Sequence, residues 1–375
     1  MKTSVVIPVL NAAGTLPALL EALAEQHPLP PDEIVLVDSL STDDTRRIAL
    51  AHTNVRVVPL ARFSHGRARN LGAREATGAI IVLMTQDAMP ADRHWLAELL
   101  APLADPWSPT APPEACLPMA MAGKPWSPTA PPEAGKPWSP TAPPEACLPM
   151  AMAGKPWSPT APPEAGKPQV AAVYSRQVPR PDAPPTEKFF LAYHFPPGPP
   201  LRRVQPAGRA LTLADVFFSN VSAAVRREVL LRHPFDETLI MSEDQQFARD
   251  LIAAGYAVVY QPASMVVHSH RYSLGTAFRR YFDSVYSLSV IFPAHDLKVS
   301  AAMGRRYLRR ETSYMLRHHP LQFPYYCLYT LVKMAGVLCS HFADRMPLWL
   351  ARACSLHRYY WEEKALDEHP PDKPL

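Results

Sequence analysis

Acidic residues follow two of the apolar runs that we predict to be buried strands. Asp38 comes directly after residues 34–37, and Asp87 comes shortly after residues 79–84. In open α/β sheets the carboxyl ends of the strands face the ligand crevice, so a carboxylate there can hold a metal ion or a substrate. The spacing is equally consistent with Asp87 being the polar residue of a turn.

A second pair of carboxylates, Glu243 and Asp244, stands at the predicted start of a helix. Residues 242–245 read Ser-Glu-Asp-Gln, the pattern of a capping box, and acidic residues suit the first turn of a helix. Capping alone therefore explains this pair, and the spacing by itself does not make it catalytic.

Two histidines, His268 and His270, follow the apolar residues 265–267, which we predict to form a strand. Side chains at positions i and i+2 of an extended chain point to the same side, so both imidazoles can reach one metal ion or phosphate. A pair of this kind is more often part of a polar surface.

A series of β-α units has to position these groups. Apolar runs predict strands at residues 4–9, 34–37, 55–60 and 79–84, with helices between them. The buried runs lack polar alternation, which is typical of strands covered on both faces in a parallel sheet. Repeated β-α units predict a right-handed, doubly wound sheet flanked by helices.

Two helix predictions are specific enough to be checked. Ser41 is the predicted N-cap of a helix that extends through Ala51, with Asp43 and Asp44 in its first turn. A second helix is predicted over residues 221–231, after the loop that contains residues 217–220.

Four motifs along the N-terminal part, VVIPVLN, LVDSLSTDDT, ARNLGAREATG and LMTQDA, resemble the nucleotide-sugar half of family 2 glycosyltransferases with the GT-A fold. The resemblance implies that Asp38 contacts the nucleobase, that Arg69 lies near it, and that Asp87 holds a divalent ion, Mg²⁺ or Mn²⁺, on the diphosphate. Ser39 and Thr85 stand where many relatives have aspartates, so a single carboxylate, Asp87, remains for the metal. Mg²⁺ can be bound by so few protein ligands because phosphate oxygens and waters complete its octahedral coordination. The full expected set is Pro8, Asn11, Asp38, Ser39, Arg69, Asn70 and Gln86 for the nucleotide sugar, and Asp87, His268 and His270 for the metal.

The variants DSxSTDDT, FxHGxARN and TQDA together resemble the rhamnosyltransferase branch of this family, which uses dTDP-L-rhamnose. The resemblance implies an inverting transfer to a glycan or lipid-linked acceptor, with Asp244 as catalytic base and Glu243 beside the acceptor. The resemblance also favours His268 and His270 as metal ligands, because the motif HSHxYS follows the last strand in this branch of the family.

Other functions remain open at this point. The same fold can use another UDP- or dTDP-sugar. A sugar nucleotidyltransferase would favour a glycine-rich loop with a lysine near the first strand, but residues 8–14 hold one glycine and no lysine. A third reading is an inactive scaffold that binds partners through a proline-rich repeat.

That repeat occupies residues 106–167, where a 31-residue stretch with nine prolines occurs twice without change. Proline at this density prevents helices and sheet ladders, so we expect a disordered insertion. The predicted organisation is a nucleotide-sugar half over residues 1–105, the insertion over 106–167, an acceptor-side half over 168–295, and a helical, membrane-associated extension over 296–375.

Composition limits the partners. The chain has 375 residues, 47% of them hydrophobic, and a net charge of +4 without a long basic run, so nucleic acid is not an expected partner. Five cysteines without a CxxC pair indicate the cytoplasm. The longest uncharged stretch near the C-terminus, 13 residues, is shorter than the roughly 20 that a spanning helix needs. A basic segment at residues 296–319 precedes an aromatic one, which indicates either a peripheral helix on the inner face of the cell membrane or packing on the catalytic domain.

Overall fold

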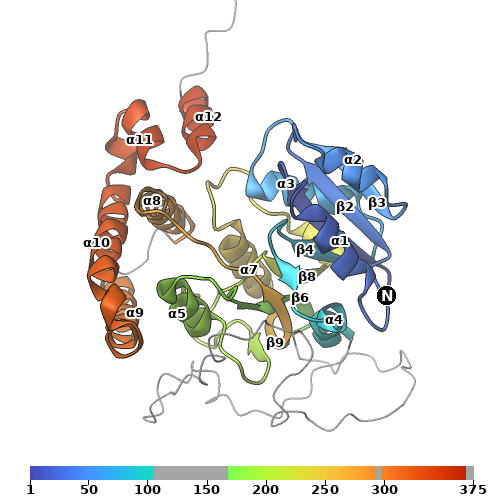
Figure 1. Ribbon diagram of the computed structural model, residues 1–375, viewed down its shortest axis with the longest axis horizontal. Coiled ribbons are helices and arrows are strands. Elements are labelled where there is room, and N and C mark those ends of the chain that lie inside the picture. Colours follow the sequence, from blue (N-terminus) through green and yellow to red (C-terminus); the bar gives the residue numbers. More distant parts are fainter. Residues whose placement is uncertain (105–167, 293–296, 369–375) are drawn as a thin grey trace, which may run out of the picture.

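A mixed sheet runs through the part of the chain that the computed structural model describes, residues 1–104, 168–292 and 297–368 (Figure 1). Its strand order is β3-β2-β1-β4-β8-β6-β9-β5, and β7 pairs with β9. Strands β1 to β4 are parallel, as are β6 and β9, while β8 is antiparallel to β4 and β6. The strands are β1 (Thr3–Val9), β2 (Glu33–Asp38), β3 (Val55–Pro59), β4 (Ile80–Met84), β5 (Met89–Pro90), β6 (Val170–Val178), β7 (Leu201–Arg203), β8 (Ser222–Arg226) and β9 (Ala257–Val267).

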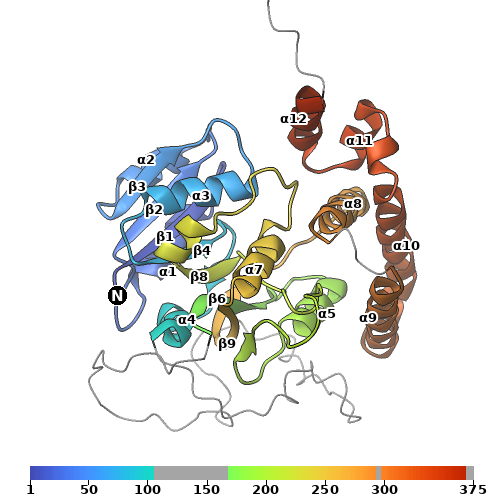
Figure 2. The ribbon, with the colours of Figure 1, turned by 180° about the vertical axis from the view of Figure 1, so that it is seen from behind.

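Helices cover both faces of the sheet (Figures 1 and 2). Successive residues of a strand point to opposite faces, and here both sets of side chains are apolar and need to be covered. In β1, Val5 and Ile7 pack with α1, α2 and α4 on one face, while Val6 packs with α3, α6 and α7 on the other. This arrangement confirms the predicted α/β class with a mostly parallel sheet. The helices are α1 (Leu16–Ala24), α2 (Thr45–Leu50), α3 (His65–Glu75), α4 (Trp95–Ala104), α5 (Pro185–His194), α6 (Arg227–Arg232) and α7 (Glu243–Ala253). The predicted insertion over residues 106–167 lies outside the described residues.

The predicted cap of α2 is wrong. The helix begins at Thr45, and Ser41 instead accepts a hydrogen bond from the backbone N–H of Asn11 at 2.9 Å. Asp43 accepts from the backbone N–H of Ala13 at 3.0 Å and precedes the helix. The polar side chains of this turn are used to join the loops after β1 and β2, a tertiary contact that a local capping pattern cannot reveal.

The helix predicted over residues 221–231 is also wrong in its first half. Residues Ser222–Arg226 form β8, because they pair with β4 on one side and β6 on the other, and only Arg227–Arg232 is helical. The predicted capping box of α7 is absent as well. Ser242 makes no capping hydrogen bond, and the Gln245 amide donates to the Phe218 carbonyl at 2.7 Å.

Three non-glycine residues of the described chain have a left-handed backbone, Asn11, Leu40 and Ser242, with φ angles of 50°, 63° and 61°. Asn11 and Leu40 follow strands β1 and β2, and Ser242 directly precedes α7. Residues in this conformation are strained by about 1–3 kcal/mol and cluster at functional sites. All three therefore mark the loops in which the candidate site should be sought.

The predicted C-terminal helices are present and form a layer at one edge of the molecule (Figure 1). α10 packs closely on α8, since a Cβ at Gly336 would collide with the Phe278 carbonyl. A buried ion pair between Glu311 and Lys333, 3.4 Å apart, joins α9 to α10. No helix among the described residues has the length and apolarity to cross a membrane. The elements are α8 (Leu274–Ile291), α9 (Leu297–His318), α10 (Phe323–Ser340), α11 (Leu348–Cys354) and α12 (Arg358–Glu368).

Candidate active site

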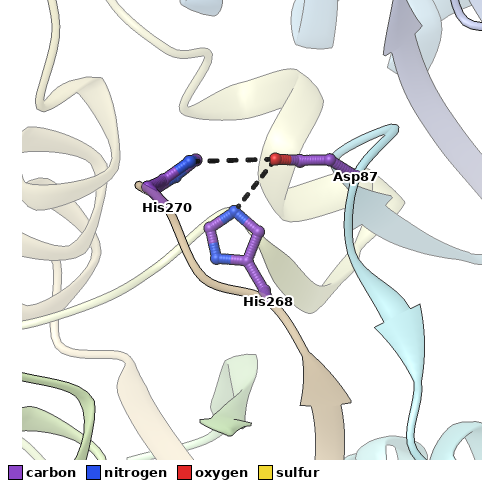
Figure 3. Close-up of side chains that lie close together, drawn as sticks. All are labelled: Asp87, His268 and His270. Atoms are coloured by element: carbon purple, nitrogen blue, oxygen red, sulfur yellow. Dashed lines mark ion pairs between the residues drawn. The ribbon is translucent and has the colours of Figure 1, made fainter. Parts of the chain in front are cut away.

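Asp87 comes together with His268 and His270, which lie 181 and 183 positions further along the chain (Figure 3). The short antiparallel pair of β5 with β9 joins Met89 to Val267, and this pairing brings the residues on either side of it into contact. The Asp87 carboxylate lies 3.4 Å from His268 Nε2 and 4.0 Å from His270 Nδ1. One ligand atom from each residue lies within 4.8 Å of the others, so the three side chains can converge on one ion.

The orientation of His268 suits a metal ligand. Its Nδ1 lies 2.9 Å from the side-chain oxygen of Gln177, whose amide nitrogen donates to Ser219. When Nδ1 carries the N–H, the neutral ring has a lone pair on Nε2 that faces the Asp87 carboxylate and can bind a cation. The protonated ring instead donates a hydrogen bond from Nε2 to that carboxylate. Two acceptors at 3.4 Å repel each other unless a cation or a second proton lies between them. A divalent cation bound by nitrogen and oxygen fits this set of ligands.

Charge and burial also favour cation binding. Burial by itself would raise the pKa of Asp87, but the hydrogen bond and charge of His268, together with His270, hold this pKa well below its usual range. Burial, together with the neighbouring His268, lowers the pKa of His270 to about 4. At neutral pH the site therefore offers one carboxylate and a neutral imidazole, both in the protonation state that binds metals.

Arg180 fixes the two chain segments that carry this group. Its guanidinium donates to the backbone carbonyl of Asp87 at 2.6 Å and to that of Ser269 at 2.5 Å. Its backbone N–H also donates to the Ser269 hydroxyl at 3.1 Å. Neither Arg180 nor Gln177 was predicted from the sequence as part of the site. Each lies at the carboxyl end of β6, so the strand-end rule that singled out Asp87 would have found them.

Replacing Arg180 by Lys should weaken Mn²⁺ binding by about 10- to 100-fold, the usual effect of removing a residue that orients metal ligands. A lysine keeps the charge but cannot reach both carbonyls in the same way. Isothermal titration with Mn²⁺ measures the effect, and Arg232→Lys, at an exposed arginine on α6, is the matched control. Equal Mn²⁺ affinities for both variants would show that the backbone holds the ligands without Arg180.

A second group forms around the start of α7. Glu243 is buried and accepts hydrogen bonds from Arg69 at 2.9 Å and from the Asn220 amide at 3.2 Å. Arg69 therefore pairs with Glu243 of the acid pair, Glu243 and Asp244, and its position near the nucleobase, which the resemblance implies, stays a prediction. Because Glu243 is engaged by two donors, it is held as an ionised, structurally fixed carboxylate, and its pKa is lowered by Arg69 despite burial.

Asp244 is in a different electrostatic state from its neighbour. It keeps some solvent exposure, but protein atoms surround it densely. Burial and the adjacent Glu243 charge raise the pKa of Asp244 to about 7. Its carboxylate accepts a hydrogen bond from the Gln245 backbone N–H at 2.9 Å, and the Asn220 backbone N–H also acts to lower its pKa. A carboxylate with a pKa near neutrality is suited to accept a proton during a reaction.

Asp38 and Ser39 lie at the end of β2, on the other side of the sheet centre. Asp38 is fully buried, and one of its oxygens accepts from the Ser41 N–H at 3.0 Å. Its second oxygen and the Ser39 hydroxyl are buried without a hydrogen-bond partner in the described structure, although Arg46 lies 3.8 Å from the Asp38 carboxylate. Buried acceptors of this kind are costly unless a ligand satisfies them.

The remaining residues expected at the nucleotide have partners within the protein. Asn70 donates to the Phe235 carbonyl and to Glu237, and accepts from the Phe235 N–H. Gln86 bonds both the N–H and the carbonyl of Leu10. Asn11 accepts from the Thr42 N–H and hydroxyl, and Pro8 is half-buried within β1. These hydrogen bonds hold the loops around the strand ends in place, and the nucleotide-binding roles of Asn70, Gln86 and Asn11 stay predictions.

Arg280 of α8 links the two halves of the site electrostatically. Burial is the main reason that the pKa values of His270, His65 and His357 are low, and the charge of Arg280 lowers all three further. His270 belongs to the metal-binding group, whereas His65 lies beside Arg69 and Glu243. The charge of Arg280 therefore acts on the Asp-His-His group through His270 and on the surroundings of the acid pair through His65.

Comparison with known families gives a match in the N-terminal part of the chain. Residues 4–108 match the family model described as glycosyl transferase family 2. The O-antigen chain rhamnosyltransferase RfbN of Salmonella typhimurium is 26% identical over 366 residues, which cover 96% of each chain. The O-antigen chain rhamnosyltransferase WbaN of Salmonella anatum is 26% identical over 335 residues, 88% of this chain and 86% of its own. These matches confirm the resemblance found in the motifs.

Solved structures show similarity at lower identity. The mannosyltransferase PcManGT from Pyrobaculum calidifontis, in complex with GDP-Man and Mn²⁺, is 19% identical with a TM-score of 0.47, covering 99% of this chain and 88% of its own. S. aureus TarS 1–349, in complex with UDP-GlcNAc, is 16% identical with a TM-score of 0.46. The match covers 98% of this chain and 89% of the TarS chain.

Proposed function

Because the chain carries a glycosyl transferase family 2 domain and is a glycosyltransferase, we propose that it moves L-rhamnose from dTDP-L-rhamnose to a hydroxyl group of a glycan acceptor, with inversion at the anomeric carbon. The two curated relatives that match most of the chain are described as O-antigen chain rhamnosyltransferases. The observation that carries the proposal is the presence, in one chain, of an Asp-His-His group that can hold a divalent ion and of a carboxylate, Asp244, whose pKa is raised to about 7. Another dTDP- or UDP-sugar is the alternative donor.

The donor base would bind at the end of β2. The free oxygen of Asp38 can accept the imide N–H of thymine, and the Ser39 hydroxyl supplies a second unpartnered polar atom beside it. Both thymine and uracil carry this N–H, so Asp38 recognises a pyrimidine nucleotide without distinguishing the two.

Asp244 would act as the base. It takes the proton of the acceptor hydroxyl while that oxygen bonds to the anomeric carbon, and the bond from that carbon to the diphosphate breaks. Rhamnose then carries the acceptor oxygen, and dTDP leaves with the bonding electron pair. Glu243 stays ionised and, with Arg69, fixes the start of α7 so that Asp244 faces the acceptor.

Asp87, His268 and His270 would hold Mn²⁺ or Mg²⁺. A divalent ion there supplies Lewis-acid stabilisation of the charge that develops on the departing diphosphate. Arg280 adds a fixed positive charge within electrostatic reach of the same region. The nitrogen ligands suit Mn²⁺ better than Mg²⁺, which prefers oxygen ligands throughout.

A thermal-shift comparison of dTDP, UDP and GDP, each with Mn²⁺, with Mg²⁺ and with EDTA, tests the donor. We expect dTDP to give the largest rise in melting temperature, and only with a divalent ion. A larger rise with UDP would assign a UDP-sugar as donor, and no rise with any nucleotide would favour the inactive scaffold.

We also propose that the C-terminal layer rests on an anionic membrane surface. α10 exposes Leu328, Leu331 and Leu338 along one side, and the neighbouring α9 exposes several arginines. Both helices lie at the outer edge of the molecule, away from β3 (Figure 1). Apolar side chains beside cations are typical of helices that lie in the interface of an anionic bilayer. A lipid-linked glycan acceptor would be reached from this position.

Replacing Leu331 by Glu should lower the fraction of protein that floats with vesicles containing phosphatidylglycerol, because a charge enters the apolar side of α10. Leu50→Glu is the matched control, since Leu331 is 68% exposed and Leu50, on α2, is 70% exposed. Equal flotation of both variants, or no flotation of the wild type, would contradict the membrane contact.

A further inference from the structure

The turn between α11 and α12 reaches back to the acid pair from the far end of the chain. The His357 ring lies edge-on to the His65 ring, with centroids 5.3 Å apart. His65 begins α3, and its carbonyl accepts from Arg69 at 3.1 Å, the same guanidinium group that bonds Glu243 at 2.9 Å. His357 is therefore separated from the acid pair by only two residues in contact.

A buried carboxylate on α8 holds this turn. Asp283 is fully buried and accepts hydrogen bonds from the backbone N–H groups of Leu356 at 2.8 Å and His357 at 3.4 Å. The Ser355 hydroxyl accepts from the same His357 N–H at 2.9 Å. The cost of burying Asp283 is offset by the Ser355 hydroxyl, by these two backbone donors and by the charge of Arg280, although burial still raises its pKa to about 6. The carboxylate thus fixes where the chain places His357.

The same segment is anchored to the residues that lead into α7. Trp361 belongs to a buried cluster with Ile240 and Met241, which directly precede the strained Ser242. The Ser287 hydroxyl on α8 donates to the Met241 carbonyl. The extension and the start of α7 are therefore packed as one unit around α8.

Two polar groups of this segment suit a sugar. Burial lowers the pKa of His357 to about 3, so the neutral ring offers one N–H donor and one acceptor nitrogen. Tyr359 stacks edge-on against Phe63 and His357, and its buried hydroxyl has no hydrogen-bond partner in the described structure. An unpartnered hydroxyl beside a neutral imidazole is a pair that can bond sugar hydroxyls.

We propose that the C-terminal extension completes the acceptor side of the active site, with His357 bonding a hydroxyl of the acceptor sugar and Asp283 acting as the residue that positions it. The inference rests on the proposed function, because it assigns the acceptor to the side of Asp244. It makes the extension part of the catalytic unit in addition to any contact with lipid.

Replacing His357 by Ala should raise the acceptor KM about tenfold, the effect of one lost hydrogen bond of about 1.4 kcal/mol. Nucleotide affinity and melting temperature should change little. His357→Gln, which keeps a donor and an acceptor, should recover part of the acceptor affinity, whereas His357→Phe, which keeps the ring packing, should not. His341→Ala, at an exposed histidine between α10 and α11, is the control. Recovery by Phe and not by Gln would show that the ring only packs and would overturn the proposal.

Asp283→Asn tests the positioning role, because it keeps the size of the side chain while changing how it accepts the two N–H groups. It should raise the acceptor KM as His357→Ala does, and the double variant should be no worse than the worse single one. Additive effects, or an unchanged acceptor KM in His357→Ala, would overturn the proposal. The comparison uses whichever nucleotide sugar the wild type transfers, so a wrong donor assignment shows in the wild type alone and does not affect this test.

Discussion

Asp244→Asn should lower the turnover number by about 10² to 10⁴ and leave dTDP affinity nearly unchanged. Asparagine keeps the shape and can still accept the Gln245 N–H, but it cannot take the proton of the acceptor. Steady-state transfer assays and dTDP titrations separate the two effects. Near-normal turnover would place the base elsewhere, and Glu243→Gln would then be the next variant to measure.

The pH dependence gives an independent check on Asp244. Burial raises its pKa to about 7, so the proton-accepting form increases as pH rises through that value, and turnover should rise from pH 6 to pH 8. The folded protein keeps a proton that the unfolded chain loses near 3.8, so this group destabilises the fold progressively between about pH 4 and pH 7. Asp244→Asn should consequently melt at a higher temperature than the wild type at pH 8.

Replacing Asp87 by Ala should remove the metal-dependent part of the stabilisation by dTDP and reduce sugar transfer to background. The variant loses the one carboxylate of the Asp-His-His group, and the two remaining imidazoles bind a hard cation poorly. At 100 times its dissociation constant a ligand stabilises a fold by about 2.7 kcal/mol, so the lost shift is easily measured.

Asp92→Ala is the control for Asp87, because Asp92 is an exposed carboxylate five residues further along. The rise in melting temperature that dTDP causes should differ between the two variants in the presence of Mn²⁺ and should be the same in EDTA. An undiminished shift in Asp87→Ala would exclude this residue as a metal ligand.

The elements that local pattern determines were predictable from the sequence. β1, β2 and β4 contain continuous apolar runs, and the helices between them show a clear helical spacing of apolar residues. These two patterns were enough to predict the doubly wound sheet of the N-terminal half. β8 was not predictable, because residues 222–226 become a strand by pairing with β4 and β6, which are distant in sequence. The capping patterns at Ser41 and Ser242 failed for the same reason, since tertiary contacts determine both turns.

Local sequence patterns likewise predicted some residues of the candidate site but not the contacts between them. The strand-end rule found Asp38 and Asp87, and the i, i+2 spacing found His268 and His270. That Asp87 meets the histidines depends on the pairing of β5, a strand of two residues, which no periodicity can reveal. Arg69 pairs with Glu243 because α3 and α7 lie on the same face of the sheet, an arrangement that only the folded structure shows.

The left-handed backbone of Asn11, Leu40 and Ser242 bears on how this protein would respond to selection for thermostability. Under the proposed function, the donor and the acceptor would meet loops that are already ordered, so the cost of ordering them does not subtract from the binding free energy. The strain of about 1–3 kcal/mol at Leu40 and at Ser242 is borne by the folded protein instead, whereas asparagine, as at Asn11, tolerates this conformation. Selection for thermostability alone should therefore replace Leu40 and Ser242 early, Leu40 by Gly or Asn for example, and the relaxed loops would then bind the nucleotide sugar less tightly.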